Sequence, residues 1–151
     1  MKAIVPALAI CIAASAAHAA EGAWNSAGSA GTYEYSVTNK EGATLRIVNA
    51  SGSGGGSGGP ECYVAFEKDG SKLPPSYRMS VDAGGETFVF SMKNGDSVGD
   101  TKTDRDQLFG LVGKLITSKK PTFSVGVPNA KLTFPTRNAA KALTDALDGC
   151  N

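Results

Sequence analysis

The glycine-rich stretch in the middle of the chain contains an arrangement that resembles a catalytic serine motif. Gly55-Gly56-Ser57-Gly58-Gly59 fits the pattern G-x-S-x-G, in which a serine at a strand-to-helix turn attacks a carbonyl carbon. That chemistry needs a histidine base, and the only histidine of the chain is His18, close to the N-terminus. Gly54-x-Gly56-x-x-Gly59 also fits a dinucleotide-binding fingerprint, but the following residues alternate as a strand does, whereas the fingerprint opens a helix. Both matches follow from the high glycine content of the tract, and we expect neither to be functional.

Carboxylates are the other side chains that could act as acids, bases or metal ligands. Four aspartates could supply oxygen ligands to calcium, although their spacing fits no EF-hand loop: Asp96, Asp100, Asp104 and Asp106. The alternative is a solvated turn leading into a helix, whose first turn favours acidic side chains. A second set could include the paired acids of a glycosidase, but the sequence does not fix their mutual distances: Glu61, Glu67, Asp82 and Glu86. We predict no catalytic residue, no metal site and no cofactor.

Aromatic side chains offer a further candidate, a ligand-binding face formed by Trp24, Tyr33, Tyr35, Tyr63 and Tyr77. Aromatic residues at strand spacing are more often core residues or cross-strand pairs. The sequence alone therefore does not identify ligand-binding residues. The pair Lys119-Lys120 is typical of a solvated helix end and predicts neither a nucleic-acid nor a membrane surface.

The first 19 residues have the three parts of a secretory signal peptide. Lys2 is followed by an apolar run from Ala3 to Ala14, and Ala17-His18-Ala19 has the small-x-small pattern of a cleavage site. We expect cleavage after Ala19, with Ala20 as the next choice. The alternatives are a retained membrane anchor, for which the apolar run is short, and a lipoprotein acylated at Cys11, for which the preceding isoleucine is too bulky.

Cleavage after Ala19 would change the net charge of the chain and the reactive side chains that it contains. Of the 151 residues, 132 would remain, and the loss of Lys2 would leave equal numbers of basic and acidic side chains. A chain without net charge is not expected to bind nucleic acid, because phosphate neutralisation needs a basic excess. The mature chain would contain no histidine and two cysteines, Cys62 and Cys150. In an oxidising compartment a disulfide between them is the expected state, and two free thiols are the alternative.

The mature chain reads as one domain that is rich in β-structure. Residues 20–31 are small, polar and glycine-rich, so we expect a flexible segment from which only Trp24 docks. Period-two alternation then predicts strands from Thr32 onward, with a hairpin turn at Asn39-Lys40-Glu41-Gly42. A glycine-rich loop is expected at 51–60, within a single domain at 32–151.

Two helices are expected in the second half of the chain. Residues 104–118 have apolar side chains at helical spacing, and Thr103 with Asp106 resembles a capping box. Residues 138–149 are expected to form a last helix that carries Leu143 and Leu147 on one face and ends at Gly149. The predicted fold is therefore α+β: an antiparallel β-sheet or sandwich of about six to eight strands with both helices packed on it. The expected disulfide would fix the last helix to the strand bearing Cys62.

Several short stretches, in this order, carry a resemblance to a known family: Gly31-Thr32-Tyr33, the strand with Cys62, Met79-Ser80-Val81-Asp82, Phe88-Val89-Phe90, Phe123-Ser124-Val125, Leu132-Thr133-Phe134 and Ala139-Ala140-Lys141-Ala142-Leu143, ending at Cys150. Their order resembles that of small exported bacterial proteins similar to the invasion-associated locus B family. The resemblance implies a periplasmic or surface protein without known catalysis, and it offers no catalytic residue.

The sequence thus favours a small exported, non-catalytic binding protein of the periplasm or the secreted fraction, without a membrane span after cleavage. Its partner would be another periplasmic or surface protein. Two alternatives remain: an inhibitor or assembly partner of another protein, which would use an edge strand or the glycine-rich loop, and a histidine-free enzyme that uses carboxylates. A concave pocket with two acids of raised pKa would favour the enzyme.

Overall fold

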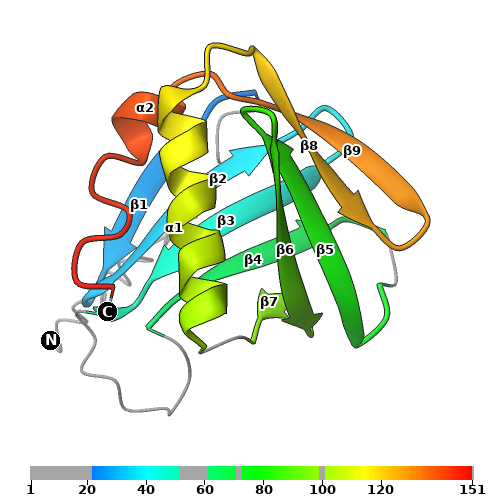
Figure 1. Ribbon diagram of the computed structural model, residues 1–151, viewed down its shortest axis with the longest axis horizontal. Helices are drawn as coiled ribbons and strands as arrows, with labels where there is room; N and C mark the ends of the chain where they lie inside the picture. Colours follow the sequence, from blue (N-terminus) through cyan, green and yellow to red (C-terminus); the bar gives the residue numbers. More distant parts are fainter. Residues whose placement is uncertain (1–21, 52–60, 71–72, 99–100, 151) are drawn as a thin grey trace, which may run out of the picture.

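The computed structural model of the protein describes residues 22–51, 61–70, 73–98 and 101–150. Nine strands form one antiparallel sheet in the order β1-β2-β3-β4-β7-β6-β5-β8-β9 (Figure 1). In chain order the elements are β1 (Asn25–Ser29), β2 (Thr32–Thr38), β3 (Ala43–Asn49), β4 (Cys62–Lys68), β5 (Ser76–Ala83), β6 (Glu86–Lys93), β7 (Asp96–Ser97), α1 (Lys102–Thr117), β8 (Thr122–Val127), β9 (Ala130–Pro135) and α2 (Ala139–Ala142). The predicted α+β class is confirmed, whereas the expected count of six to eight strands is too low.

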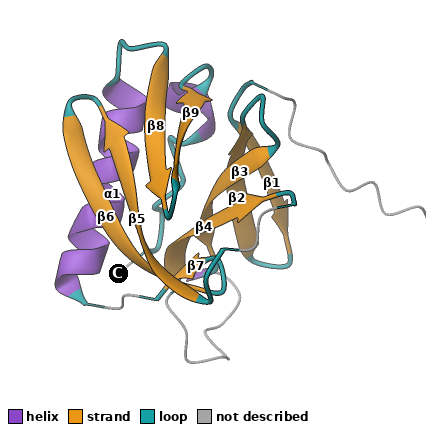
Figure 2. Ribbon diagram, turned by 90° about the vertical axis from the view of Figure 1, so that its right-hand side faces the viewer, coloured by secondary structure: helices purple, strands orange, loops and turns teal. Residues whose placement is uncertain are grey.

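The sheet bends so strongly that its two halves face each other across the core. Figure 2 shows β1 to β4 on one side and β5, β6, β8 and β9 on the other. The short strand β7 joins the halves, and its register with β4 is the pair formed by Ala65 of β4 and Asp96 of β7. The two halves also meet where β2 approaches β9: just after β2, the Asn39 side-chain amide donates to the carbonyl of Thr133 at 3.2 Å.

The core is a single cluster to which both halves of the sheet and both helices contribute. The alternating residues of the strands point into it, as the period-two pattern predicts. Its centre contains a chain of rings: Trp24 stacks on Phe123, Phe123 on Phe134, and Phe134 meets Phe66 edge-on. Trp24 is fully buried, so the expected docking of this residue is confirmed.

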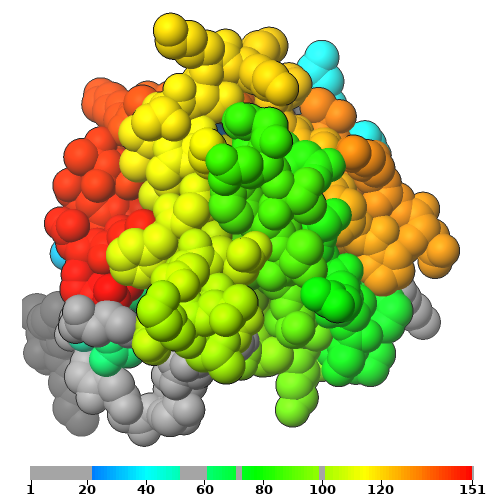
Figure 3. Space-filling view, viewed as in Figure 1, coloured from blue at the N-terminus to red at the C-terminus, as the bar shows by residue number. Residues whose placement is uncertain are grey.

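Helix α1 covers the place where the two halves of the sheet separate. Strand β6 continues beyond its pairing with β7, and the side-chain carbonyl of Gln107 accepts the backbone N–H of Val89 there at 2.9 Å. On the opposite strand, the Ser97 hydroxyl accepts the backbone N–H of Val64 at 3.0 Å. Side chains therefore satisfy donors that a neighbouring strand would otherwise bind, and the helix protects an exposed strand edge. In the space-filling view, α1 lies between the C-terminal segment (residues 139–150, red) and the β5–β6 hairpin (green), and the β8–β9 hairpin (orange) lies on the other side of β5–β6 (Figure 3).

The position of α1 confirms the helix expected at 104–118, with a start two residues earlier. Its N-cap is Thr101, whose hydroxyl accepts the backbone N–H of Asp104, and the Asp104 carboxylate accepts the backbone N–H of Thr101. The capping box is thus one helical half-turn earlier than the pair Thr103 and Asp106 suggested. Both pairs have the same T-x-x-D spacing, so the sequence pattern could not distinguish them.

The helix expected at 138–149 is wrong in its length. Only Ala139–Ala142 are helical, and the chain continues as a series of turns in which a backbone N–H bonds the carbonyl three residues earlier, as from Cys150 to Leu147. The side-chain amide of Asn49, on β3, donates to the carbonyls of Ala146 and Asp148 at 3.2 and 2.8 Å. In a continued helix the Ala146 carbonyl would accept from the N–H of Cys150, but here it accepts from Asn49, and the Cys150 N–H bonds the carbonyl of Leu147.

The N-terminal segment also differs from expectation. Residues 20–31 were expected to lack regular structure, but Asn25–Ser29 form β1 and pair with β2 along their whole length. Gly28 lies opposite Tyr33, and a Cβ at Gly28 would overlap the tyrosine ring, so the glycine lets the ring lie across the strand. Cross-strand packing of this kind stabilises a strand whose own residues have little β-propensity. Strands β1 and β7 are the two that the sequence pattern did not predict.

Candidate binding site on the outer face of β5, β8 and β9

The disulfide between Cys62 and Cys150 is present and confirms the predicted pairing. It joins the first residue of β4 to the end of the C-terminal segment, with the Cα atoms 5.7 Å apart and 88 positions between them in sequence. Leu143 is fully buried and Leu147 packs against the core, so the apolar side of this segment does lie on the sheet. Asn49 of β3 lies directly opposite Cys62 of β4, so the Asn49 amide and the disulfide hold the C-terminal segment at the same end of this strand pair.

The aromatic candidates do not form a common face. Trp24 and Tyr35 are buried in the core, whereas Tyr33 is exposed and covers Gly28. Burial raises the pKa of Tyr35, Tyr63 and Tyr77, with a further increase from nearby aspartates. The Tyr35 hydroxyl donates to the carbonyl of Asp145 at 3.3 Å. In contrast, the buried hydroxyl of Tyr77 has no hydrogen-bond partner among the described residues.

The four aspartates considered for calcium have separate structural roles. Asp104 caps α1, Asp106 pairs with Lys102 one turn away at 2.7 Å, and Asp96 lies on β7. Asp100 lies outside the described residues. Within the part of the chain that the structure describes, no three acidic, histidine or cysteine side chains gather where they could hold a metal ion.

The second set of carboxylates is also distributed among different partners. Glu67 on β4 pairs with Arg46 at 3.3 Å, and Glu86 at the start of β6 pairs with Lys114 of α1. Glu61 is exposed at the start of the described residues after the glycine-rich tract. Asp82 differs from the others because it lies at the centre of a polar network.

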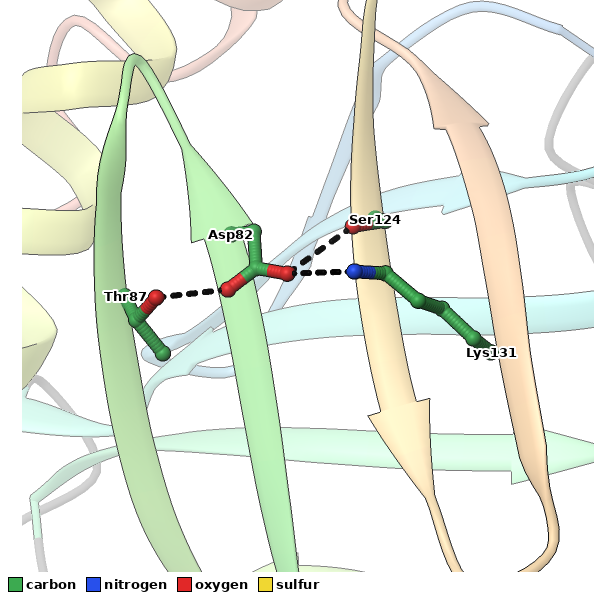
Figure 4. A network of polar contacts seen from close by, with 4 residues as sticks. All are labelled: Asp82, Thr87, Ser124 and Lys131. Carbon is green, nitrogen blue, oxygen red and sulfur yellow. Dashed lines mark hydrogen bonds and ion pairs between the residues drawn. The ribbon is translucent and has the colours of Figure 1, made fainter.

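Asp82 accepts three hydrogen bonds on the face of the sheet that points away from the core (Figure 4). Its Oδ1 accepts from the Thr87 hydroxyl at 2.7 Å, while its Oδ2 accepts from the Ser124 hydroxyl at 3.2 Å and the Lys131 ammonium at 2.9 Å. These donors come from β6, β8 and β9, so one carboxylate connects four strands. The hydrogen bond from Lys131 is the largest cause of the lowered pKa of Asp82, followed by that from Thr87.

A hollow of about 300 Å³ opens beside this network. Strands β5 and β8 are paired only as far as Asp82 and Ser124, and beyond that pair the two hairpins separate. The polar side chains that line the hollow come from the strands on both sides and from the segment before β8: Asp82, Lys120, Thr122, Ser124, Lys131 and Thr133. The turn Gly84-Gly85 and Phe123 complete its wall.

The state of Asp82 decides which acid–base chemistry this carboxylate can supply in the hollow. Ser124 donates its proton to a carboxylate whose pKa is lowered, so Asp82 is a weak base and remains ionised where a general acid would hold a proton. Sequence reasoning named Asp82 only as one of several acids. Its pairing with Thr87 across the Gly84-Gly85 turn could be read from the hairpin, but the approach of Ser124 and Lys131 depends on the long-range pairing of β5 with β8.

These features define a small disulfide-bonded, β-rich domain with a polar hollow on its outer face. The chain belongs to the YfjT family, whose family model matches residues 22–143. No curated protein matches the chain, and no solved structure does. The resemblance to the invasion-associated locus B family stays a prediction. In the described part of the chain, no helix is both long and apolar enough to cross a membrane.

Proposed function

We propose that this YfjT-family protein is exported to the periplasm or secreted and acts there by binding, without catalysing a reaction. The observation that carries the proposal is the disulfide between Cys62 and Cys150. Disulfides persist in oxidising compartments and are rare in the cytosol, where thiols are kept reduced. The leader-like first 19 residues, which lie outside the described residues, support the same compartment.

The polar network supports binding as the mode of action. Both oxygens of the Asp82 carboxylate are engaged by donors from neighbouring strands, and its pKa is lowered. A carboxylate-based enzyme would need an acid that retains its proton near neutral pH. The alternative of a histidine-free enzyme therefore finds no support in the arrangement around Asp82.

Fractionation of cells that express the full chain tests the proposal. We expect the protein in the periplasmic or secreted fraction, with Cys62 and Cys150 protected from a thiol-alkylating reagent until a reductant is added. A matched variant, Lys2→Glu, reverses the charge of the leader without changing the folded domain and should reduce export. Recovery of the unaltered protein in the cytosol with both cysteines alkylated would refute the proposal.

A second candidate, an inhibitor or assembly partner of another protein, is favoured by the edge of the sheet at β1. This strand contains only small, uncharged residues and has neither the lysine nor the proline that often protect sheet edges. Such an edge can accept a strand from another chain. A photo-crosslinking residue at Ala27 should then capture a partner in the envelope, while one at Asn129, in the exposed β8–β9 turn, should not. Equal capture from both positions would remove the support for this candidate.

A further inference from the structure

We propose that the hollow between the β5–β6 turn and the start of β8 binds an oxyanion group, such as the phosphate, sulfate or carboxylate of a small ligand. The inference rests on the proposed function, since it names the chemistry that the binding protein would recognise. Three features of the hollow point to such a ligand: its excess of donors over acceptors, the ion pair that holds Lys131 beside it, and the separation of the β5–β6 and β8–β9 hairpins.

The only carboxylate that lines the hollow already has both of its oxygens engaged by donors of the protein. Asp82 accepts from Thr87, Ser124 and Lys131, so neither of its oxygens is left as the main acceptor for a cation or a ligand hydroxyl. Lys131 uses one ammonium proton for Asp82 and retains two more for other acceptors. Asp82 therefore holds the Lys131 ammonium at the hollow without removing its capacity to donate.

Lys120 supplies the second positive charge, and its ammonium has no ion-pair partner among the described residues. The backbone at this position is fixed on both sides: its N–H donates to the Ser118 hydroxyl at 3.2 Å, and its carbonyl accepts from the Thr136 hydroxyl at 2.5 Å. The side chain therefore starts from a defined place beside the hollow that it lines. With Lys120, Lys131 and Asp82, the lining carries one positive charge in excess.

Neutral donors complete the arrangement. Thr122 and Thr133 are exposed and line the hollow, and no hydrogen bond joins their hydroxyls to another described residue. The Gly84-Gly85 turn has positive φ at both residues, 59° and 89°, as a tight hairpin turn of this kind needs. A Cβ at Gly85 would meet no atom within 4 Å, so this residue leaves the turn open beside the hollow, whereas Gly84 faces Lys114 of α1. Two ammonium groups, free hydroxyls and a bare turn form a donor-rich surface, and oxyanions are the ligands that accept from such a surface.

Nuclear magnetic resonance titration of the oxidised mature protein with inorganic phosphate tests the inference. We expect saturable shifts of the amides of Gly84, Gly85, Thr122 and Ser124. Lys120→Gln should weaken phosphate binding about tenfold or more, because it removes a charged donor. The control is Lys119→Gln, which makes the same change of charge one residue away, at an exposed lysine that does not line the hollow. It should change the dissociation constant less than twofold.

The outcomes separate this inference from the proposed function. Saturation that Lys120→Gln weakens and Lys119→Gln does not would support the site, and parallel titrations with sulfate and acetate would show which oxyanion it prefers. Equal weakening by the two variants would mean diffuse attraction to surface charge and would overturn the inference. The absence of saturable shifts up to molar phosphate would overturn it as well. Neither result would affect export, which fractionation measures independently.

Discussion

Removal of the Asn49 side chain should release the C-terminal segment from the sheet. Asn49 is only 3% exposed. Its Nδ2 donates to the carbonyls of Ala146 and Asp148, and its Oδ1 accepts from the backbone N–H and the hydroxyl of Ser51 at 3.1 and 2.7 Å. Asn49→Ala eliminates all four hydrogen bonds, while the disulfide keeps the segment attached to β4 at its end.

The four hydrogen bonds indicate how much Asn49→Ala should lower the free energy of unfolding. Each hydrogen bond contributes about 0.5 to 1.5 kcal/mol net, and a buried carbonyl left without a donor costs more, so Asn49→Ala should lower the free energy of unfolding by about 3 kcal/mol. Urea denaturation of the oxidised protein, followed by circular dichroism, measures this value. Asn25→Ala is the control, because the Asn25 amide bonds the nearby carbonyl of Ala23 and no other group of the described residues, and it should cost under about 1 kcal/mol.

Hydrogen exchange provides a second, local measurement. In Asn49→Ala, the amides of Ala146, Asp148 and Cys150 should exchange faster, whereas those of the β5–β6 hairpin should change little. A loss under about 1 kcal/mol, with unchanged exchange in the segment, would refute the reasoning. It would mean that packing of the segment, and not the amide of Asn49, determines its turn structure.

Four further predictions concern the core, the disulfide and two polar groups. Leu143→Ala should lower the free energy of unfolding by about 2 to 5 kcal/mol in urea denaturation, because Leu143 is fully buried; an unchanged midpoint would mean that the segment is not part of the core. Cys150→Ser should destabilise by about 4 kcal/mol, since the disulfide closes a long loop in the unfolded chain; equal stability of oxidised and reduced protein would contradict this. Tyr77→Phe should be neutral or stabilising in thermal denaturation, because the lost hydroxyl has no partner among the described residues. Tyr35→Phe loses the bond to Asp145 and should destabilise by about 1 kcal/mol. A larger loss of stability in Tyr77→Phe than in Tyr35→Phe would contradict these hydrogen-bond assignments. Asp82 has a lowered pKa, so its contribution to the free energy of unfolding is present above the ordinary carboxyl pKa and is lost as pH falls through the lowered value. Asp82→Asn should therefore make the free energy of unfolding fall less steeply at acidic pH. An unchanged fall at acidic pH would count against the network.

Local patterns allowed the prediction of most strands and of α1. The alternation of Tyr35 and Val37 with polar neighbours marks β2, and Gly42 adopts the positive φ that its hairpin turn needs. Strand β7 has only two residues, too few for a pattern, and it is identified by its partners on β4 and β6. The sequence predicts a helix where the C-terminal turns lie because Leu143 and Leu147 have helical spacing, while the carbonyls of these turns bond Asn49 on a distant strand, which no local pattern reveals.

The disulfide and the polar hollow differ in how far the sequence reveals them. If the first 19 residues are removed as the sequence predicts, Cys11 leaves with them and the two remaining cysteines allow one intramolecular pairing, so the prediction of Cys62 with Cys150 needed no structure. The hollow depends on β5 pairing with β8 across 42 positions of sequence and on the point where that pairing ends, at Asp82 and Ser124. No local pattern encodes that end point, and Lys120 and Lys131 show no relation in the sequence.

Intact mass analysis of the protein recovered from the envelope of expressing cells tests the central claim of an exported, disulfide-bonded binding protein most directly. The sample is alkylated without reductant before measurement. We predict one species that begins at Ala20, carries no alkylated cysteine and has two hydrogens fewer than the reduced chain. A species that retains Lys2 and carries alkylated Cys62 and Cys150 would contradict the account.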